Sequence, residues 1–318
     1  MCSLSENSSN ITCIPELRNG SGLEVFLQQK WNDFLDVAGD DPANLHVWGM
    51  LACVYSQYWL IGGLYVFMDV RGWPRFLRKY KTQPGVNEPI SWADLQRVSC
   101  RLKFERMSPY YTRIIFIIQI LKTVLINQAL LTVPMAYFGF HLAGKHTLPD
   151  VRALPRLTTI IRDLIICLVL WEATNYCTHR VLHHRLIYRF VHKRHHEFTA
   201  PIAWVASYVH PVEHIVSDTI PASIGPALLN CHLVTAVLWF SWLVHHSLIT
   251  HSGYHLPLLK SPEAHDYHHL KFTQCYSPLG VMDWLFGTDD RFRQSKHAKR
   301  DRRLFGTKSA RELVPDKD

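Results

Sequence analysis

The protein has 318 residues, of which 48% are hydrophobic, 12% aromatic and 19% charged, with a formal net charge of +8 and 20 histidines. The apolar content excludes a disordered chain, and eight scattered cysteines without a CxxC pair argue against a thiolate zinc site or a disulfide scaffold. The basic residues flank apolar runs and form no stripe interleaved with aromatic side chains, so they indicate membrane-flanking charge and not a nucleic-acid surface.

The first 44 residues are polar and acidic, and they carry no basic start followed by an apolar run, so no signal peptide is predicted. Three Asn-x-Ser/Thr sequons begin at Asn7, Asn10 and Asn19. Such triplets are usable for glycosylation where the segment lies in a lumen.

Four apolar stretches follow, at 45–70, 114–140, 157–177 and 215–250. A membrane-spanning helix needs about 20 apolar residues, which the first two stretches supply. The third contains Arg162, Asp163 and Glu172, so we expect it to pack against other helices or to lie partly at the interface. The fourth is broken by prolines and is too short for two spans of about 20 residues each. It therefore favours a short hairpin that enters the membrane and leaves it on the same side.

Charge asymmetry predicts the orientation of these stretches. Five basic residues between 71 and 81 follow the first span directly and indicate its cytosolic end. The N-terminus is then lumenal, while the histidine-rich segment and the basic tail share the cytosolic face. The predicted organisation is a lumenal tail (1–44), membrane helices with a basic loop (45–156), a catalytic region (157–290) and a basic cytosolic tail (291–318).

Histidine is the unusual feature of the sequence. Sixteen of the twenty histidines lie between His179 and His269, in boxes that read HRVLHH, HKRHH, HPVEH, HSGYH and HDYHH. The recurrent offsets are three and four residues, which place side chains on one face of a helix. Two imidazoles at this spacing can reach one metal ion. We leave the isolated residues His46, His141, His146, His232 and His297 as structural, and His245 and His246 as second-layer or interfacial residues.

The boxes supply more nitrogens than one ion can use and about enough for two ions. Metal coordination also removes the cost of burying many imidazoles without partners. An open-sided, nitrogen-rich site beside a membrane favours two iron ions and oxygen chemistry over structural zinc, although zinc can occupy such a site in purified protein. Nearby carboxylates can accept the remote N–H of a ligand; these candidates are Glu172, Glu197, Glu213 and Asp266.

The order HxxxHH, HxxHH, HxxxH, HxxHH over roughly 157–290 resembles the fatty acid hydroxylase superfamily of membrane di-iron oxidases, in particular its C-4 methylsterol oxidase branch. The resemblance implies an all-α integral membrane bundle with a cytosolic, histidine-rich metal-binding cap. It also implies an endoplasmic reticulum location and electrons from cytochrome b5 and its reductase. Carried over by position, the implied ligands are His179, His183, His192, His195, His196, His251, His255, His265, His268 and His269. Additional or supporting candidates are His184, His210, Glu213, His214 and Asp266.

The expected activity is hydroxylation of an unactivated C–H bond of a lipid, with a sterol as the leading substrate. His255 stands where members of the sterol branch often carry an acid, so acyl chains and sphingolipids stay open as substrates. Desaturation is a second alternative, although the eight residues between His183 and His192 favour the hydroxylase spacing. A third alternative is a non-catalytic membrane protein in which zinc stabilises a lipid-binding or signalling scaffold.

Overall fold

The computed structural model describes residues 21–85, 109–143 and 148–316. The predicted glycosylation sites at Asn7, Asn10 and Asn19 lie outside these residues. Within them the chain is helical and contains no β-strand; a single isolated bridge joins Lys81 to Tyr254. The predicted all-α bundle is therefore confirmed.

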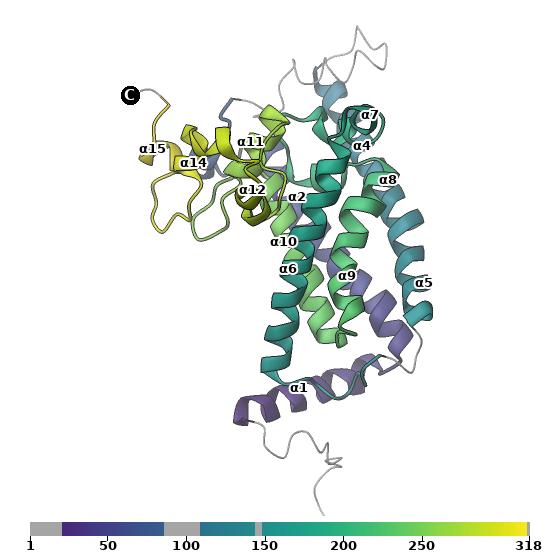
Figure 1. The fold of residues 1–318 in the computed structure, drawn as a ribbon. Coiled ribbons are helices and arrows are strands. Elements are labelled where there is room, and N and C mark those ends of the chain that lie inside the picture. Colours follow the sequence, from purple (N-terminus) through teal and green to yellow (C-terminus); the bar gives the residue numbers. More distant parts are fainter. Residues whose placement is uncertain (1–20, 86–108, 144–147, 317–318) are drawn as a thin grey trace, which may run out of the picture.

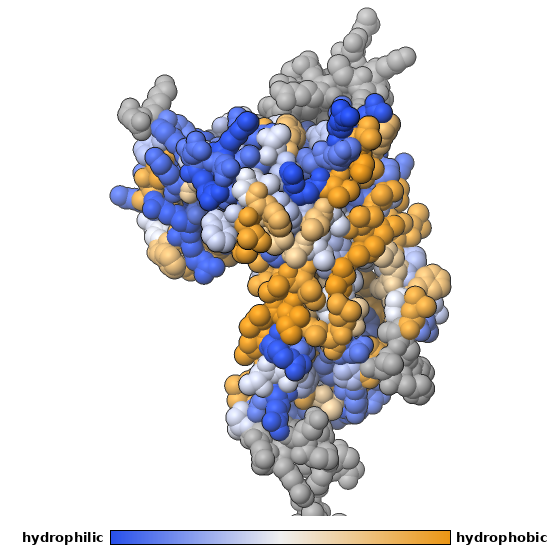
Figure 2. All heavy atoms as spheres, in the orientation of Figure 1, coloured by the Kyte–Doolittle hydropathy of each residue, from blue (hydrophilic) through white to orange (hydrophobic). Residues whose placement is uncertain are grey.

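The long helices stand side by side in one bundle, and most of the short ones form a cap at one end (Figure 1). The bundle contains α2 (Met50–Arg71) with the preceding turn η2 (Asn44–Gly49), α4 (Pro109–Asn127), η4 (Gln128–Thr132), α5 (Val133–Ala143), α6 (Leu157–Leu182), η7 (His214–Thr219), α9 (Ile220–Leu228) and α10 (Leu233–His251). The amphipathic helix α1 (Gly22–Ala38) lies across the opposite end from the cap. On the face shown in Figure 2, a band of hydrophobic side chains covers the bundle between two more polar ends.

Among the residues that the structure describes, three helices are long and apolar enough to cross a membrane: Asn44–Arg71, Ile117–Leu142 and Leu233–His251. The first two agree with the predicted spans. In the fourth stretch the structure differs in part from the prediction, because α10 alone has the length of a span whereas α9 is short. The two helices still form a hairpin that returns to the cap end (Figure 1). The 26-residue helix α6 is long enough but falls outside the spans, since charged residues interrupt it.

Helix α6 packs closely against α9. A Cβ atom at Gly225 of α9 would lie 2.7 Å from Sγ and 2.8 Å from Cα of Cys167, so only glycine permits this approach. Asn175 and Thr178 of α6 also hydrogen-bond or contact Ser217 of η7. These contacts hold the end of α6 that carries His179 against the η7–α9 segment.

The cap contains the turns and helices that follow the bundle ends. They are η3 (Arg75–Tyr80), α7 (Arg185–Tyr188), η5 (His192–Glu197), η6 (Ala203–Ser207), α8 (Pro211–Glu213), α11 (Glu263–Lys271), α12 (Val281–Phe286), α13 (Asp290–Arg293), α14 (Lys296–Arg300) and α15 (Ala310–Leu313).

Buried polar contacts join the cap to the bundle. Lys81, which follows η3, is buried and pairs with Asp69 near the end of α2 at 2.6 Å. Its ammonium also donates to the carbonyl of Ser252 and lies over the ring of Tyr254. Lys81 therefore does not contribute to the exposed positive charge from which the orientation was predicted.

Candidate metal centre

Nine histidines converge where the cap meets the bundle. They come from the end of α6, from η5, from the end of α10 and from α11, which are far apart in the sequence but meet at one end of the bundle. Their ring nitrogens form two groups, and within each group the nitrogens lie within 4.8 Å of one another. The five-histidine group consists of His179, His183, His192, His196 and His268, and the four-histidine group of His195, His251, His265 and His269.

In the five-histidine group the Nε2 atoms face one another. His192 Nε2 lies 3.1 Å from that of His179, 2.9 Å from that of His183 and 3.1 Å from that of His196. His268 Nε2 lies 3.2 Å from that of His196. Two imidazole nitrogens bound to one ion at about 2.1 Å are roughly 3.0–3.4 Å apart, so these separations fit a shared ion.

The four-histidine group shows the same arrangement. His265 Nε2 lies 2.9 Å from that of His251 and 3.1 Å from that of His269, and His195 Nε2 lies 3.5 Å from that of His251. The two groups are neighbours, because the ring of His192 stacks on that of His195 with centroids 5.3 Å apart.

The helical offsets divide the histidine boxes between the two groups. In the boxes HRVLHH, HKRHH and HDYHH, partners four residues apart share a group, as His192 and His196 do, whereas partners three residues apart, such as His192 and His195, belong to different groups. Helix α11 repeats this division, with His265 and His269 in one group and His268 in the other. The HKRHH and HDYHH boxes thus each contribute to both groups, which the offsets alone did not predict.

Hydrogen bonds made by Nδ1 determine that Nε2 of the same ring is the nitrogen with a free lone pair. Nδ1 of His179 lies 2.6 Å from the carbonyl oxygen of Tyr276, and Nδ1 of His268 lies 2.7 Å from that of Gln274. A carbonyl can only accept, so Nδ1 must carry the proton and the neutral ring presents a bare lone pair at Nε2. His251 and His269 are oriented in the same way by the carbonyls of Ser247 and Phe198.

Converging lone pairs repel one another unless a cation lies between them. Burial and neighbouring imidazoles lower the pKa values of six of these histidines well below the usual range, so protonation does not supply that cation near neutral pH. The six are His192, His195, His196, His265, His268 and His269. The donor sets therefore fit bound metal ions, and imidazole is a good ligand for iron, zinc and copper.

His255 was predicted as a ligand, but the structure places it outside both groups. Helix α10 ends at His251, and Gly253 then adopts a positive φ of 66°, so the offset of four no longer places the two rings on one helical face. His255 Nε2 lies 2.8 Å from the carbonyl oxygen of Arg302, and Nδ1 lies 3.8 Å from Glu263. We therefore leave His255 out of the proposed ligand set.

The supporting candidates have separate positions. Glu213 accepts a hydrogen bond from His192 Nδ1 at 2.8 Å, which makes it the carboxylate that orients a ring of the five-histidine group. Asp266 is buried and accepts from Gln83, and His214 contacts Thr132 and Asp218. His184 and His210 accept backbone N–H groups at the starts of α7 and α8, respectively.

The other two carboxylates predicted as candidates hydrogen-bond to groups outside the histidine boxes. Glu172 accepts the backbone N–H groups of Leu279, Val281 and Met282, and Glu197 accepts from Tyr208. Glu172 thereby holds the loop before α12.

The residues that hold the carbonyl groups opposite the histidine Nδ1 atoms were not predicted from the sequence. The Asp283 carboxylate accepts hydrogen bonds from the backbone N–H groups of Tyr276 and Ser277. These bonds position the Tyr276 carbonyl within hydrogen-bonding distance of His179 Nδ1. A carbonyl acceptor leaves no signal in the sequence, because every residue has one.

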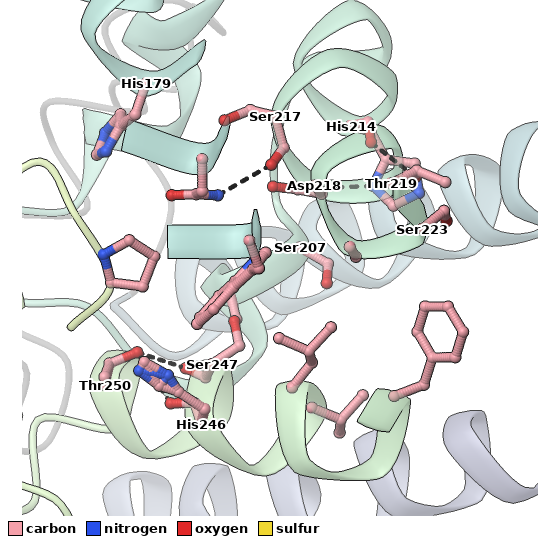
Figure 3. Close-up of a pocket in the computed structure, with 18 of the residues that line it drawn as sticks. His179, Ser207, His214, Ser217, Asp218, Thr219, Ser223, His246, Ser247 and Thr250 are labelled. Atoms are coloured by element: carbon pink, nitrogen blue, oxygen red, sulfur yellow. Dashed lines mark hydrogen bonds and ion pairs between the residues drawn. The ribbon is translucent and has the colours of Figure 1, made fainter. Parts of the chain in front are cut away.

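A cavity of about 880 Å³ runs from the histidine groups into the bundle. His179, His192, His195, His251 and His265 line its end at the cap. Its bundle walls are largely apolar and include Met50, Leu51, Val54, Met135, Phe140, Phe240, Leu243 and Val244. Figure 3 shows part of the lining, with His246, Ser247 and Thr250 of α10 across from His214 and Thr219 of η7.

Comparison with known proteins agrees with the resemblance seen in the histidine boxes. The family model described as fatty acid hydroxylase matches residues 164–288. The chain is 36% identical over 291 residues to fatty acid hydroxylase domain-containing protein 2 of Homo sapiens, with 92% of this chain and 81% of the relative covered. It is 30% identical to fatty acid hydroxylase ahd1 of Mycosarcoma maydis (78% and 58% covered) and 26% identical to methylsterol monooxygenase 1 of Gallus gallus (89% and 88% covered). No solved structure matches the chain.

Proposed function

The chain belongs to the fatty acid hydroxylase family, and from this premise we propose that it is a membrane-bound di-iron monooxygenase that hydroxylates an unactivated C–H bond of a lipid. The observation that carries the proposal is the direct contact between two nitrogen-rich groups and one large apolar cavity. A metal centre that opens into a lipid-sized cavity inside a membrane bundle suits oxidation of a hydrocarbon.

One set of residues would hold the ions, and another would hold the substrate. The nine histidines named above would hold two ions through Nε2, while the carbonyls and Glu213 keep the rings in place through Nδ1. When bound, the iron pair supplies the activation of dioxygen, which amino-acid side chains cannot perform. The apolar walls accept the hydrocarbon and keep bulk water away from the oxidised carbon.

A sterol is the leading substrate in this proposal, with acyl chains and sphingolipids as alternatives. The similarity to methylsterol monooxygenase 1 over 89% of this chain supports the sterol, and the similarity to a fatty acid hydroxylase supports the acyl chain. Ligand pockets usually measure about 300–1,000 Å³, and a cavity of about 880 Å³ can accept either class.

We further propose that the protein lies in the endoplasmic reticulum membrane with its cap in the cytosol. Exposed Arg71, Arg75, Arg302 and Arg303 lie at or near the cap and agree with the positive-inside rule. They also offer a positive surface to an acidic electron carrier. Cytochrome b5 and its reductase, as the family resemblance implies, would supply the electrons.

The decisive experiment combines metal analysis with product analysis on protein purified without oxygen. We expect two iron ions per chain, oxygen uptake on a panel of sterols, fatty acids and sphingolipids, and an alcohol as the product. His268→Ala should abolish uptake, whereas His184→Ala, which alters an exposed ring outside both groups, should not.

A new double bond in the product would indicate a desaturase instead. Tightly bound zinc with no oxygen uptake on any lipid would refute the enzymatic proposal and favour a zinc-stabilised scaffold.

A further inference from the structure

One wall of the apolar cavity is polar. Segment η7 and its neighbours place a carboxylate and small hydroxyl side chains on this wall, namely those of Ser207, Ser217, Asp218, Thr219 and Ser223. Figure 3 shows Asp218, Thr219 and Ser223 grouped near His214. The segment is a π-helix between α8 and α9, a conformation that is rare and frequent at functional sites.

Asp218 contributes little to packing at this position. Its side chain remains 39% exposed, against 10% for His214, whose Nδ1 lies 3.3 Å from the Asp218 carboxylate. A carboxylate within a membrane-embedded bundle is costly, and residues of this kind usually serve a ligand or a transport path. The exposed part of Asp218 contributes to the cavity lining and is accessible to a ligand there.

The polar wall lies next to the five-histidine group. Ser217, the neighbour of Asp218, accepts a hydrogen bond at its carbonyl from Asn175, and its hydroxyl lies 3.3 Å from that of Thr178. Thr178 directly precedes His179, which lines the same cavity. Glu213, five residues before Asp218, bonds to His192.

From these contacts we infer that Asp218 accepts a hydrogen bond from a hydroxyl group of the lipid substrate. The cavity therefore selects lipid alcohols over lipids whose polar end offers acceptors alone. The hydroxyl end then lies toward the histidines, and the hydrocarbon extends along the apolar walls between α2, α5 and α10. This inference rests on the proposed lipid hydroxylase function and narrows its substrate class.

The chemistry of the acceptor explains the selectivity. A carboxylate that accepts from a hydroxyl gains a charge-assisted hydrogen bond, which is stronger than a neutral one. A ketone at the same position offers no proton and places its lone pairs against those of Asp218. Loss of one hydrogen bond to a charged group weakens binding by about tenfold or more.

The test measures equilibrium binding of two matched pairs to the purified full-length protein: cholestanol with cholestanone, and a long-chain secondary alcohol with its ketone. We expect the wild type to bind the alcohol about tenfold more tightly in at least one pair. Asp218→Ala should weaken binding of that alcohol alone and remove the preference. Asp218→Asn, whose amide oxygen still accepts, should keep part of it. Asp33→Ala on α1, an exposed acidic control, should match the wild type.

The outcomes separate this inference from the proposed function. A preference for the alcohol in the long-chain pair alone, lost in Asp218→Ala, supports the role of Asp218 and argues against a sterol substrate. Equal binding of alcohol and ketone by the wild type overturns the role of Asp218, while the lipid hydroxylase stands. An alcohol preference that persists in Asp218→Ala also overturns it. No binding of any of the four lipids overturns the role of Asp218, while oxygen uptake on the panel of sterols, fatty acids and sphingolipids tests the lipid hydroxylase separately. Metal content measured on each variant shows whether the fold is retained.

Discussion

The five-histidine and four-histidine groups are built alike but differ in how their rings are held. Backbone carbonyls orient rings in both groups, and in the first a buried carboxyl group, that of Glu213, also accepts from the ring of His192. The first also has one more nitrogen. A carboxylate partner raises the basicity of its histidine, so we expect the five-histidine group to hold its ion more tightly.

The largest expected effect comes from removing one ring from either group. His192 contacts three other rings in the five-histidine group, and His269 belongs to the four-histidine group. We expect His192→Ala and His269→Ala each to lower turnover by at least about 100-fold, since both ions are needed. Metal analysis should show one ion lost in each variant. Two retained ions in either variant would contradict the assignment of that ring.

The next largest expected effect is a loss of folding stability of the metal-free protein as the pH falls. Burial lowers the pKa values of at least three rings in each group below those of an unfolded chain, so the folded state keeps them neutral. As pH falls below about 6.5, the unfolded chain binds protons that the folded one does not, and stability decreases.

The decrease is at most about 1.4 kcal/mol per pH unit for each such histidine. Thermal unfolding of the metal-free protein between pH 7 and 5 should show a falling midpoint. A midpoint that rises toward pH 5 would argue against neutral, buried rings.

A smaller effect should distinguish the two groups directly. Glu213→Gln keeps the size of the side chain but replaces the carboxyl group that orients His192 with an amide, and it should weaken metal affinity about 10–100-fold in the five-histidine group alone. Competition with a chelator measures the two affinities. Glu197→Gln is the matched control, because Glu197 accepts a hydrogen bond from Tyr208 and belongs to neither histidine group. Equal weakening of both ions by Glu213→Gln would remove the difference between the groups.

The smallest effect on the metal centre is expected at His255. Both ions should remain in His255→Ala, because this ring lies outside the two groups. The variant should lose about 1–3 kcal/mol of stability, since the ring is buried and bonded to the Arg302 carbonyl. Metal analysis and thermal unfolding measure the two expectations. Loss of one ion, with the fold intact, would return His255 to the ligand set.

The spacing and hydropathy of the sequence were sufficient to predict the long helices and the gathering of histidine boxes at one end of the bundle. The spans near 45–70 and 114–140 followed from long, predominantly apolar runs, since length and apolar composition are the properties that a membrane span requires. The hairpin of α9 and α10 was predicted, but the length of α10 was not. That length depends on the position of the turn, and α10 begins directly after His232.

Offsets and hydropathy are local properties, so the amino-acid sequence was enough to predict many imidazoles at helical spacing beside apolar segments. How those rings divide into two groups, why His255 lies outside them and which carbonyls orient them became known only from the packing of distant segments. Each of these depends on where a helix ends and which distant segment packs beside it. A nitrogen becomes a ligand through its direction in space, and spacing along the chain limits that direction without determining it.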